Sequence, residues 1–363
     1  MMDEIWAVIG GGHGGQTFAG HMAMLGKRVR LHSKSKEKVD ALNVTKCIEL
    51  HHAIEGVGRI EFATTDIGKA LKDATHVVMV LPSNWHRETT RMMAPYLRDG
   101  QFVLLLPEAS CGAIAFRKAL KDFGCTKKLI VGAAASLPYA TRSIRSGVCH
   151  VSGFKSSMKI AALPASDNAK LGAAFCKAFP CFVLCKNVVE TSIDSTNAMM
   201  HPAPTLLNVA RIEAVPRQSY EYYRDGITPS VGALLEKMDA ERIAVAQALG
   251  NEQRTLKQCY IDLWGCGDAS MPLWRVIQNN EGYRGIMNLQ SLKERPFTED
   301  IPYSLVAISA LGVVAGVKTP CIDAVCTLGR AILGEELDIG RTAENLGIAG
   351  MSREELIRYI NGD

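Results

Sequence analysis

The chain has 363 residues, of which 47% are hydrophobic and 21% charged, and its formal net charge at pH 7 is +4. This length exceeds that of one usual compact domain, and the hydrophobic share excludes a disordered chain, so we expect two folded domains. Because the basic residues are scattered and form no runs, the composition argues against a nucleic-acid partner.

The cysteines and the apolar segments bear on location. Eleven cysteines are spread along the chain with no CxxC pair and no Cys/His cluster at zinc-ligand spacing, so we expect reduced thiols, no metal site and a cytoplasmic protein. Asp3 and Glu4 lead directly into an apolar strand pattern, unlike a signal peptide. The most apolar segment, residues 301–317, is interrupted by Pro302 and two serines, so we expect a buried core helix there and no membrane partner.

Strand and helix patterns alternate through the first half of the chain. Residues 5–9 form an apolar run without alternation, typical of a parallel strand covered on both faces, and a helix follows from Gly10 to about Gly26. Four further strands of the same sheet are expected at 29–31, 76–81, 101–106 and 129–133. Helices are expected at 66–74 (with Asp66 as N-cap), 87–97 and 113–123. This alternation predicts an α/β fold with a doubly wound parallel sheet.

The pattern changes after about Cys185, where strand-like runs disappear and helical periodicity continues to the end. One helix face in this region carries Leu234, Met238, Val245 and Leu249. We therefore expect a dinucleotide-binding domain of residues 1–185 and an all-α domain of residues 186–363 that binds substrate and carries catalysis.

Gly10, Gly12 and Gly15 form a G-x-G-x-x-G motif between the first strand and the first helix. Glycine at these positions permits a tight turn and lets backbone amides approach a pyrophosphate closely. The motif alone is weak, but its place at the start of a βαβ series predicts a Rossmann domain that binds a nicotinamide dinucleotide.

The position that selects between NAD and NADP lies at the end of the second strand. NAD-specific domains carry a carboxylate there for the adenosine ribose, whereas this chain has Ser33 followed by Lys34, with Lys36 nearby. These groups could hold a 2′-phosphate, so we expect NADP, with NAD as the alternative. Solvated lysines without a ligand would give the same pattern.

Candidates for proton transfer are few in the second half of the chain. His201 is its only histidine, and histidine is the commonest proton donor near neutral pH. A hydrogen-bonded core histidine is an equally good interpretation from the residues alone. His86, just beyond the expected strand 76–81, is a competing candidate.

Several phrases resemble the octopine/nopaline (opine) dehydrogenase family, including bacterial N-(1-carboxyethyl)amino acid dehydrogenases. They are residues 197–202 (Asn-Ala-Met-Met-His-Pro), 225–232 (Asp-Gly-Ile-Thr-Pro-Ser-Val-Gly), 236–242 (Glu-Lys-Met-Asp-Ala-Glu-Arg), 283–286 (Tyr-Arg-Gly-Ile) and 295–300. The resemblance implies reductive condensation of an amino acid with a 2-oxo acid such as pyruvate, through an imine. It also implies a helical domain of the 6-phosphogluconate dehydrogenase-like type.

The resemblance further implies roles for three residues. His201 and Asp300 match the family's catalytic pair, in which the carboxylate would fix the histidine tautomer and favour the imidazolium. Arg295 matches a cleft residue and could hold a substrate carboxylate in a bidentate fork.

Two other functions stay open at this point. Lys186-Asn187 is similar to the Lys-Asn of glycerol-3-phosphate dehydrogenases, which implies a ketone reductase of that or the ketopantoate reductase type. A dinucleotide sensor without turnover is the other. The sequence indicates neither the amino acid nor the oxo acid, and a homodimer is compatible with it but not indicated by it.

Overall fold

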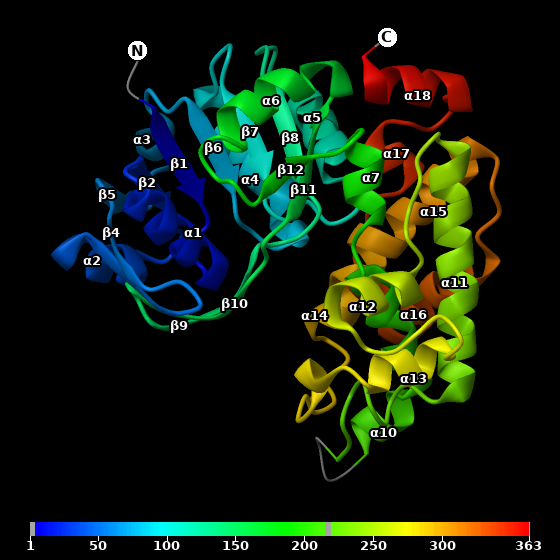
Figure 1. Ribbon diagram of the computed structural model, residues 1–363. Helices are drawn as coiled ribbons and strands as arrows, with labels where there is room; N and C mark the ends of the chain where they lie inside the picture. Colours follow the sequence, from blue (N-terminus) through cyan, green and yellow to red (C-terminus); the bar gives the residue numbers. More distant parts are fainter. Residues whose placement is uncertain (1–3, 215–218, 363) are drawn as a thin grey trace. The chain divides into compact units, whose positions relative to one another are not determined.

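The computed structural model describes residues 4–214 and 219–362. The chain divides into two compact units (Figure 1). The first unit comprises residues 4–108, 112–191 and 358–362, and the second comprises 109–111 and the described part of 192–357. All strands of the described residues lie in the first unit, the last ending at Leu184, which confirms an α/β part followed by a helical part. The functional division at residue 185 stays a prediction.

The main sheet of the first unit has eight strands. Their spatial order is β12 (Phe182–Leu184), β11 (Met158–Leu163), β8 (Ile130–Ala134), β7 (Phe102–Leu105), β6 (His76–Met79), β1 (Ile5–Ile9), β2 (Arg28–His32) and β5 (Phe62–Thr64). The run from β5 to β8 is parallel throughout and has the strand order of a Rossmann sheet. The expected parallel sheet is therefore confirmed. At its edge, however, β11 pairs with β8 in antiparallel orientation, and β12 pairs with β11 in parallel.

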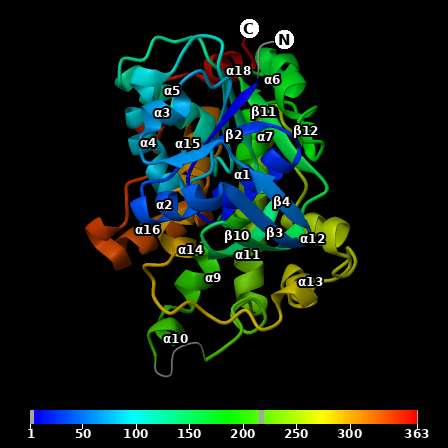
Figure 2. The same ribbon diagram turned by 90° about the vertical axis from the view of Figure 1, so that its left-hand side faces the viewer.

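Helices lie on both faces of this sheet (Figure 2). One face carries α1 (His13–Met24) and α6 (Asn168–Phe175), and the other carries α3 (Ile67–Leu71), α4 (His86–Met93) and α5 (Gly112–Asp122). Asp66 caps α3 as expected, because its carboxylate accepts the Lys69 N–H at 3.0 Å. Trp6 of β1, stacked on His76 at 4.3 Å, is fully buried in the core beneath α6.

A second, four-stranded sheet in the first unit was not expected from the sequence. Its order is β4 (Gly56–Arg59), β3 (Cys47–His52), β10 (Val148–Phe154) and β9 (Tyr139–Arg145). Helix α1 packs against it, and Gly58 of β4 approaches so closely that an added Cβ would lie 2.0 Å from the Gly20 carbonyl oxygen. Helix α1 is thus held between two sheets.

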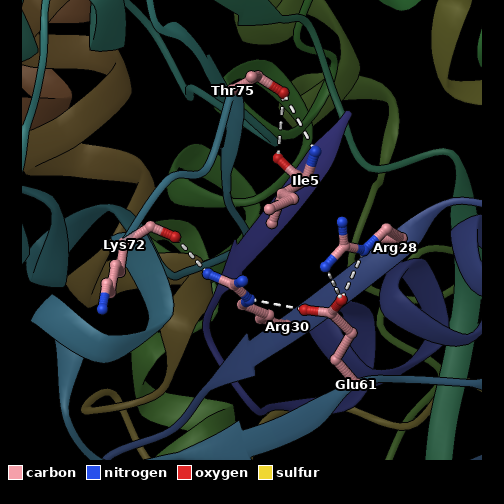
Figure 3. A network of polar contacts seen from close by, with 6 residues as sticks. All are labelled: Ile5, Arg28, Arg30, Glu61, Lys72 and Thr75. Atoms are coloured by element: carbon pink, nitrogen blue, oxygen red, sulfur yellow. Dashed lines mark hydrogen bonds and ion pairs between the residues drawn. The ribbon is translucent and has the colours of Figure 1, made fainter. Parts of the chain in front are cut away.

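Strand β2 is anchored near its start by a polar network (Figure 3). The Arg28 and Arg30 side chains both donate to the Glu61 carboxylate, at 2.6 and 2.7 Å, and Arg30 also donates to the Lys72 carbonyl. These bonds fix the strand that delivers Ser33 to the glycine-rich turn.

The end of the chain belongs to the first unit. Helix α18 (Arg353–Asn361) brings the Asn361 amide oxygen within 3.1 Å of the Asn187 side-chain nitrogen, which donates to it. Gly362 packs so tightly that an added Cβ would lie 2.3 Å from Ser166 Oγ.

The second unit is helical. Its helices, after α7 (Val188–Ile193) at the unit boundary, are α8 (Asn197–Met200), α9 (Pro202–Leu207), α10 (Val209–Glu213), α11 (Pro229–Ala248), α12 (Leu256–Trp264), α13 (Leu273–Gln278), α14 (Arg295–Thr298), α15 (Val306–Ala315), α16 (Pro320–Leu333) and α17 (Ala343–Leu346). Met238 and Val245 of α11 are fully buried and Leu249 nearly so, while Leu234 is partly buried, which confirms the predicted apolar face.

The expected core helix at 301–317 is present but divided. A π-helical turn, Ile301–Leu305, begins directly after Asp300 with Pro302 in its first turn, and α15 follows. Residues 295–315 are long and apolar enough to cross a membrane, but 67% of their most apolar window is buried, as in the core helix of a folded domain.

Candidate active site

The glycine-rich turn has the backbone geometry of a dinucleotide site. At Gly10 φ is +127°, and an added Cβ would lie 2.2 Å from the Val80 carbonyl oxygen. At Gly15 an added Cβ would lie 1.7 Å from the Gly10 carbonyl oxygen, whereas at Gly12 it would meet nothing within 4 Å. The first and third glycines therefore serve close packing, and the middle one leaves open space at the N-terminus of α1, where a pyrophosphate fits.

The start of α1 is also a positive environment. Gly12 provides no side-chain cap, so the first N–H groups of α1 can donate hydrogen bonds to a ligand. Burial, together with the positive charges of Arg142 and Lys38, lowers the pKa of His13, the first helical residue. These two cations come from β9 and α2 (Lys36–Thr45), and no sequence motif marked them as neighbours of the turn.

A buried glutamine ties the turn to the second sheet. Gln16 donates to the Gly11 carbonyl at 3.0 Å and accepts the Gly147 N–H at 2.9 Å. His13 accepts the Ser143 N–H at 2.9 Å. The second sheet, which was not expected from the sequence, thus stabilises the glycine-rich turn through these hydrogen bonds.

Ser33 lies where the sequence predicted an adenosine contact. An added Cβ on Gly11 would lie 2.6 Å from Ser33 Oγ, so the end of β2 touches the glycine turn. Lys34 Nζ lies 4.3 Å from the centre of the exposed Trp85 ring, in cation–π range. Lys36, in contrast, pairs with Asp40 at 2.5 Å.

The structure brings His201 and Asp300 together. His201 lies between α8 and α9, where Pro202 ends one helix and begins the next, and Asp300 lies before the π-helical turn. His201 Nδ1 is 2.7 Å from Asp300 Oδ2, and both side chains are largely buried. Because an ionised carboxylate only accepts, Nδ1 carries the hydrogen and Nε2 is the atom that can exchange a proton.

Two tyrosines complete this site, and sequence reasoning missed both. The Tyr223 hydroxyl lies 2.9 Å from His201 Nε2, and the Tyr222 hydroxyl donates to the His201 carbonyl at 2.7 Å. Burial, the nearby Tyr283 and the charge of Asp300 raise the pKa of Tyr223, so its hydroxyl is neutral at physiological pH.

The family phrases could have revealed these tyrosines. Gly226 lies against the Tyr222 carbonyl oxygen, 2.3 Å from an added Cβ, and the Tyr222 N–H donates to the Ile286 carbonyl at 2.8 Å. The phrases 225–232 and 283–286 therefore hold the turn that carries both tyrosines.

The segment 236–242, which also resembles the family, stabilises the second unit. Arg242, almost fully buried, pairs with Asp239 at 2.7 Å and donates to the carbonyls of Ile193 and Arg254. This arginine cross-links three segments of the second unit.

Arg295 lies near this site but is not an isolated cation. Its Nε pairs with Glu299 Oε2 at 2.6 Å, and its side chain is 57% exposed. Its charge nevertheless acts on the Tyr223 hydroxyl.

The competing candidates have other surroundings. His86 is buried, with Nε2 3.1 Å from the Leu81 carbonyl oxygen, as expected for a structural histidine. Lys186 and Asn187 belong to the first unit; the Lys186 N–H donates to Glu190 at 3.0 Å, and the Asn187 side chain holds the end of α18.

Comparison with known proteins identifies the family. The model for the α-helical domain of NAD/NADP octopine/nopaline dehydrogenases matches residues 184–333. An opine dehydrogenase of Arthrobacter sp. (strain 1C) is 36% identical over 351 residues, which cover 96% of each chain. This chain belongs to the opine dehydrogenase family. An octopine dehydrogenase of Mizuhopecten yessoensis is 24% identical over 90% of each chain.

The fold of this opine dehydrogenase family member agrees with that assignment. A solved structure of octopine dehydrogenase with NADH and L-arginine superposes with a TM-score of 0.85 over 99% of this chain and 98% of the other, at 21% identity. The model for the N-terminus of NAD-dependent glycerol-3-phosphate dehydrogenase matches only residues 6–107, so the ketone-reductase alternative is not favoured. The chain is an oxidoreductase that acts on CH–NH groups and binds a nicotinamide dinucleotide.

Proposed function

We propose that this enzyme condenses the amino group of an amino acid with a 2-oxo acid such as pyruvate, and reduces the product with His201 as acid and base. The contact that carries the proposal is the 2.7 Å bond between His201 Nδ1 and Asp300, which leaves Nε2 for the substrate proton. Sensing without turnover needs no such pair.

The chemistry needs one well-placed proton. The amine attacks the keto carbon, and the resulting carbinolamine loses its hydroxyl as water only when that oxygen is protonated. His201, as an imidazolium held by Asp300, supplies this proton from Nε2; the nitrogen lone pair then expels water, and a protonated imine remains. A nicotinamide dinucleotide held at the glycine turn would supply the hydride that reduces the carbon of this protonated imine.

Arg295 is proposed to hold the carboxylate of the oxo acid. A guanidinium can form two parallel hydrogen bonds with a carboxylate, which fixes both the position and the orientation of the keto carbon. Glu299 orients this guanidinium through the 2.6 Å pair at Nε.

The activity is tested by following NADPH and NADH oxidation with pyruvate across a panel of amino acids. We expect oxidation that requires both an amine and an oxo acid. Oxidation by an oxo acid alone would favour the ketone reductase, and no oxidation with any pair would favour the sensor.

For the cofactor we propose a preference for NADP, with NAD as the alternative. Ser33 at the glycine turn and Lys34 beside Trp85 are a hydroxyl and a cation suited to a 2′-phosphate. We expect a higher kcat/KM for NADPH; equal or better use of NADH would overturn this.

Two substitutions test whether Ser33 and Lys34 cause the preference for NADPH. Ser33→Asp should reverse it, because a carboxylate repels the phosphate and binds a free ribose diol. Lys34→Ala should cost roughly tenfold to a hundredfold with NADPH and little with NADH, the usual worth of one charge-assisted bond. Lys36→Ala is the matched control, since Lys36 already pairs with Asp40.

The same proposal covers organisation and location. Residues 1–185 would bind the dinucleotide and 186–363 the substrate, in a cytoplasmic enzyme that acts as a homodimer. Reduced cysteines throughout the described residues and three exposed apolar side chains on α15 and α16 (Val313, Leu328 and Ile332) support these points. Cell fractionation and light scattering of the purified enzyme test them; a secreted protein or a monomer would contradict them.

A further inference from the structure

Both ring nitrogens of His201 are occupied within the second unit. Asp300 holds Nδ1 at 2.7 Å, and the Tyr223 hydroxyl lies 2.9 Å from Nε2. Any proton that leaves or reaches His201 through Nε2 therefore meets the oxygen of Tyr223 first.

Tyr223 is not free to swing aside. Its ring stacks on Tyr283 with centroids 3.9 Å apart and planes 15° apart, and meets Tyr222 edge-on at 4.9 Å. Tyr222 is itself fixed, because its hydroxyl contacts both the His201 carbonyl and Thr205 Oγ1, each at 2.7 Å. Displacing Tyr223 for a substrate atom would break this aromatic packing.

A phenol hydroxyl suits both states of the histidine. It accepts from the imidazolium and donates to the neutral imidazole, so the bond to Nε2 persists when the proton has moved. The positive charge of Arg295 lowers the pKa of this same hydroxyl, against the effect of burial, so Arg295 interacts with it electrostatically.

We propose that Tyr223 is a catalytic residue that relays the proton between His201 Nε2 and the substrate oxygen, an inference that rests on the proposed function. The Nε2 proton passes to the Tyr223 oxygen while the Tyr223 hydroxyl proton passes to the carbinolamine oxygen. The carbon–oxygen bond then breaks and water leaves. His201 ends as the neutral imidazole, Tyr223 ends as the neutral phenol, and Asp300 stays ionised throughout.

The first test is Tyr223→Phe, which keeps the ring and removes the relay atom. We expect kcat to fall roughly a hundredfold or more, the usual worth of general acid–base catalysis, with little change in KM or in dinucleotide affinity. The matched control is Tyr220→Phe: its buried hydroxyl has no hydrogen-bond partner within the described residues, so activity should be near normal. Near-normal turnover of Tyr223→Phe would overturn the relay.

The second test needs no variant and so does not depend on folding. In single-turnover reactions of the native enzyme, a relay moves more than one proton in the same step, so the rate should curve with the deuterium content of the solvent. A linear dependence would overturn it. If His201→Ala keeps full activity, the proposed function itself fails; if His201→Ala is inactive and the dependence is linear, only the relay fails.

Discussion

The glycine turn and the His201 site differ in the kind of atoms that form them. The glycine turn is backbone, shaped by atoms so close that a single methyl group at Gly15 would lie 1.7 Å from a carbonyl oxygen. The His201 site is a set of buried side chains joined by hydrogen bonds of 2.7 to 2.9 Å. Substitutions in the turn should therefore act through shape and binding, and those around His201 through chemistry with binding intact.

His201→Ala should give the largest effect. Without the acid–base group kcat should fall roughly a hundredfold or more, while dinucleotide affinity, measured by fluorescence titration, stays unchanged. Lys186→Ala is the control for the ketone-reductase mechanism. An inactive Lys186→Ala with near-normal His201→Ala would contradict the assignment of the reacting end.

Asp300→Asn should lower kcat by less than His201→Ala does. Asparagine keeps the size but removes the carboxylate that orients His201 and fixes its tautomer, so kcat should fall roughly tenfold or more, though less than on loss of the histidine itself. Steady-state assays should show the loss in kcat with dinucleotide affinity unchanged. A kcat equal to that of the native enzyme would show that Asp300 does not support His201.

The glycine turn can be separated into its two functions with one pair of variants. Gly12→Ala should leave the melting temperature unchanged but weaken dinucleotide binding roughly tenfold, because the methyl group fills the open space at the helix start. Gly10→Ala should instead destabilise the protein by about 1–3 kcal/mol, because φ is +127° and Val80 is in contact. Equal melting temperatures for Gly12→Ala and Gly10→Ala would contradict this division between a binding role and a packing role.

Arg295→Lys should be the mildest change. A lysine keeps the charge but not the planar fork, so KM for the oxo acid should rise several-fold with kcat nearly constant in steady-state assays. A large loss of kcat would instead mean that Arg295 acts in the chemical step.

The parts predicted from sequence share a local signal. Strands β1, β7 and β8 of the Rossmann sheet are continuous apolar runs, and the glycine motif spans six residues, so both are visible in short windows of sequence. The second sheet was missed because β4 is a short strand containing two glycines, and β3 pairs with β10 from a distant part of the chain.

The reacting end has no local signal. His201 and Asp300 are 99 positions apart, and only the family resemblance paired them. Tyr223 is one of nine tyrosines, and only its place two residues before the family segment 225–232 distinguishes it; its position depends on a turn held by Gly226 and Ile286. Side-chain chemistry that is assembled by tertiary structure cannot be derived from periodicity.

Asn361 and Gly362, at the end of α18, pack onto the rest of the first unit. A ribosome makes the sheet of that unit early, but its last piece emerges only after residues 192–357, a delay on the order of ten seconds. Until then the first unit lacks the contact of Asn187 with Asn361 and that of Ser166 with Gly362. A deletion that removes α18 would consequently damage the part of the enzyme encoded first.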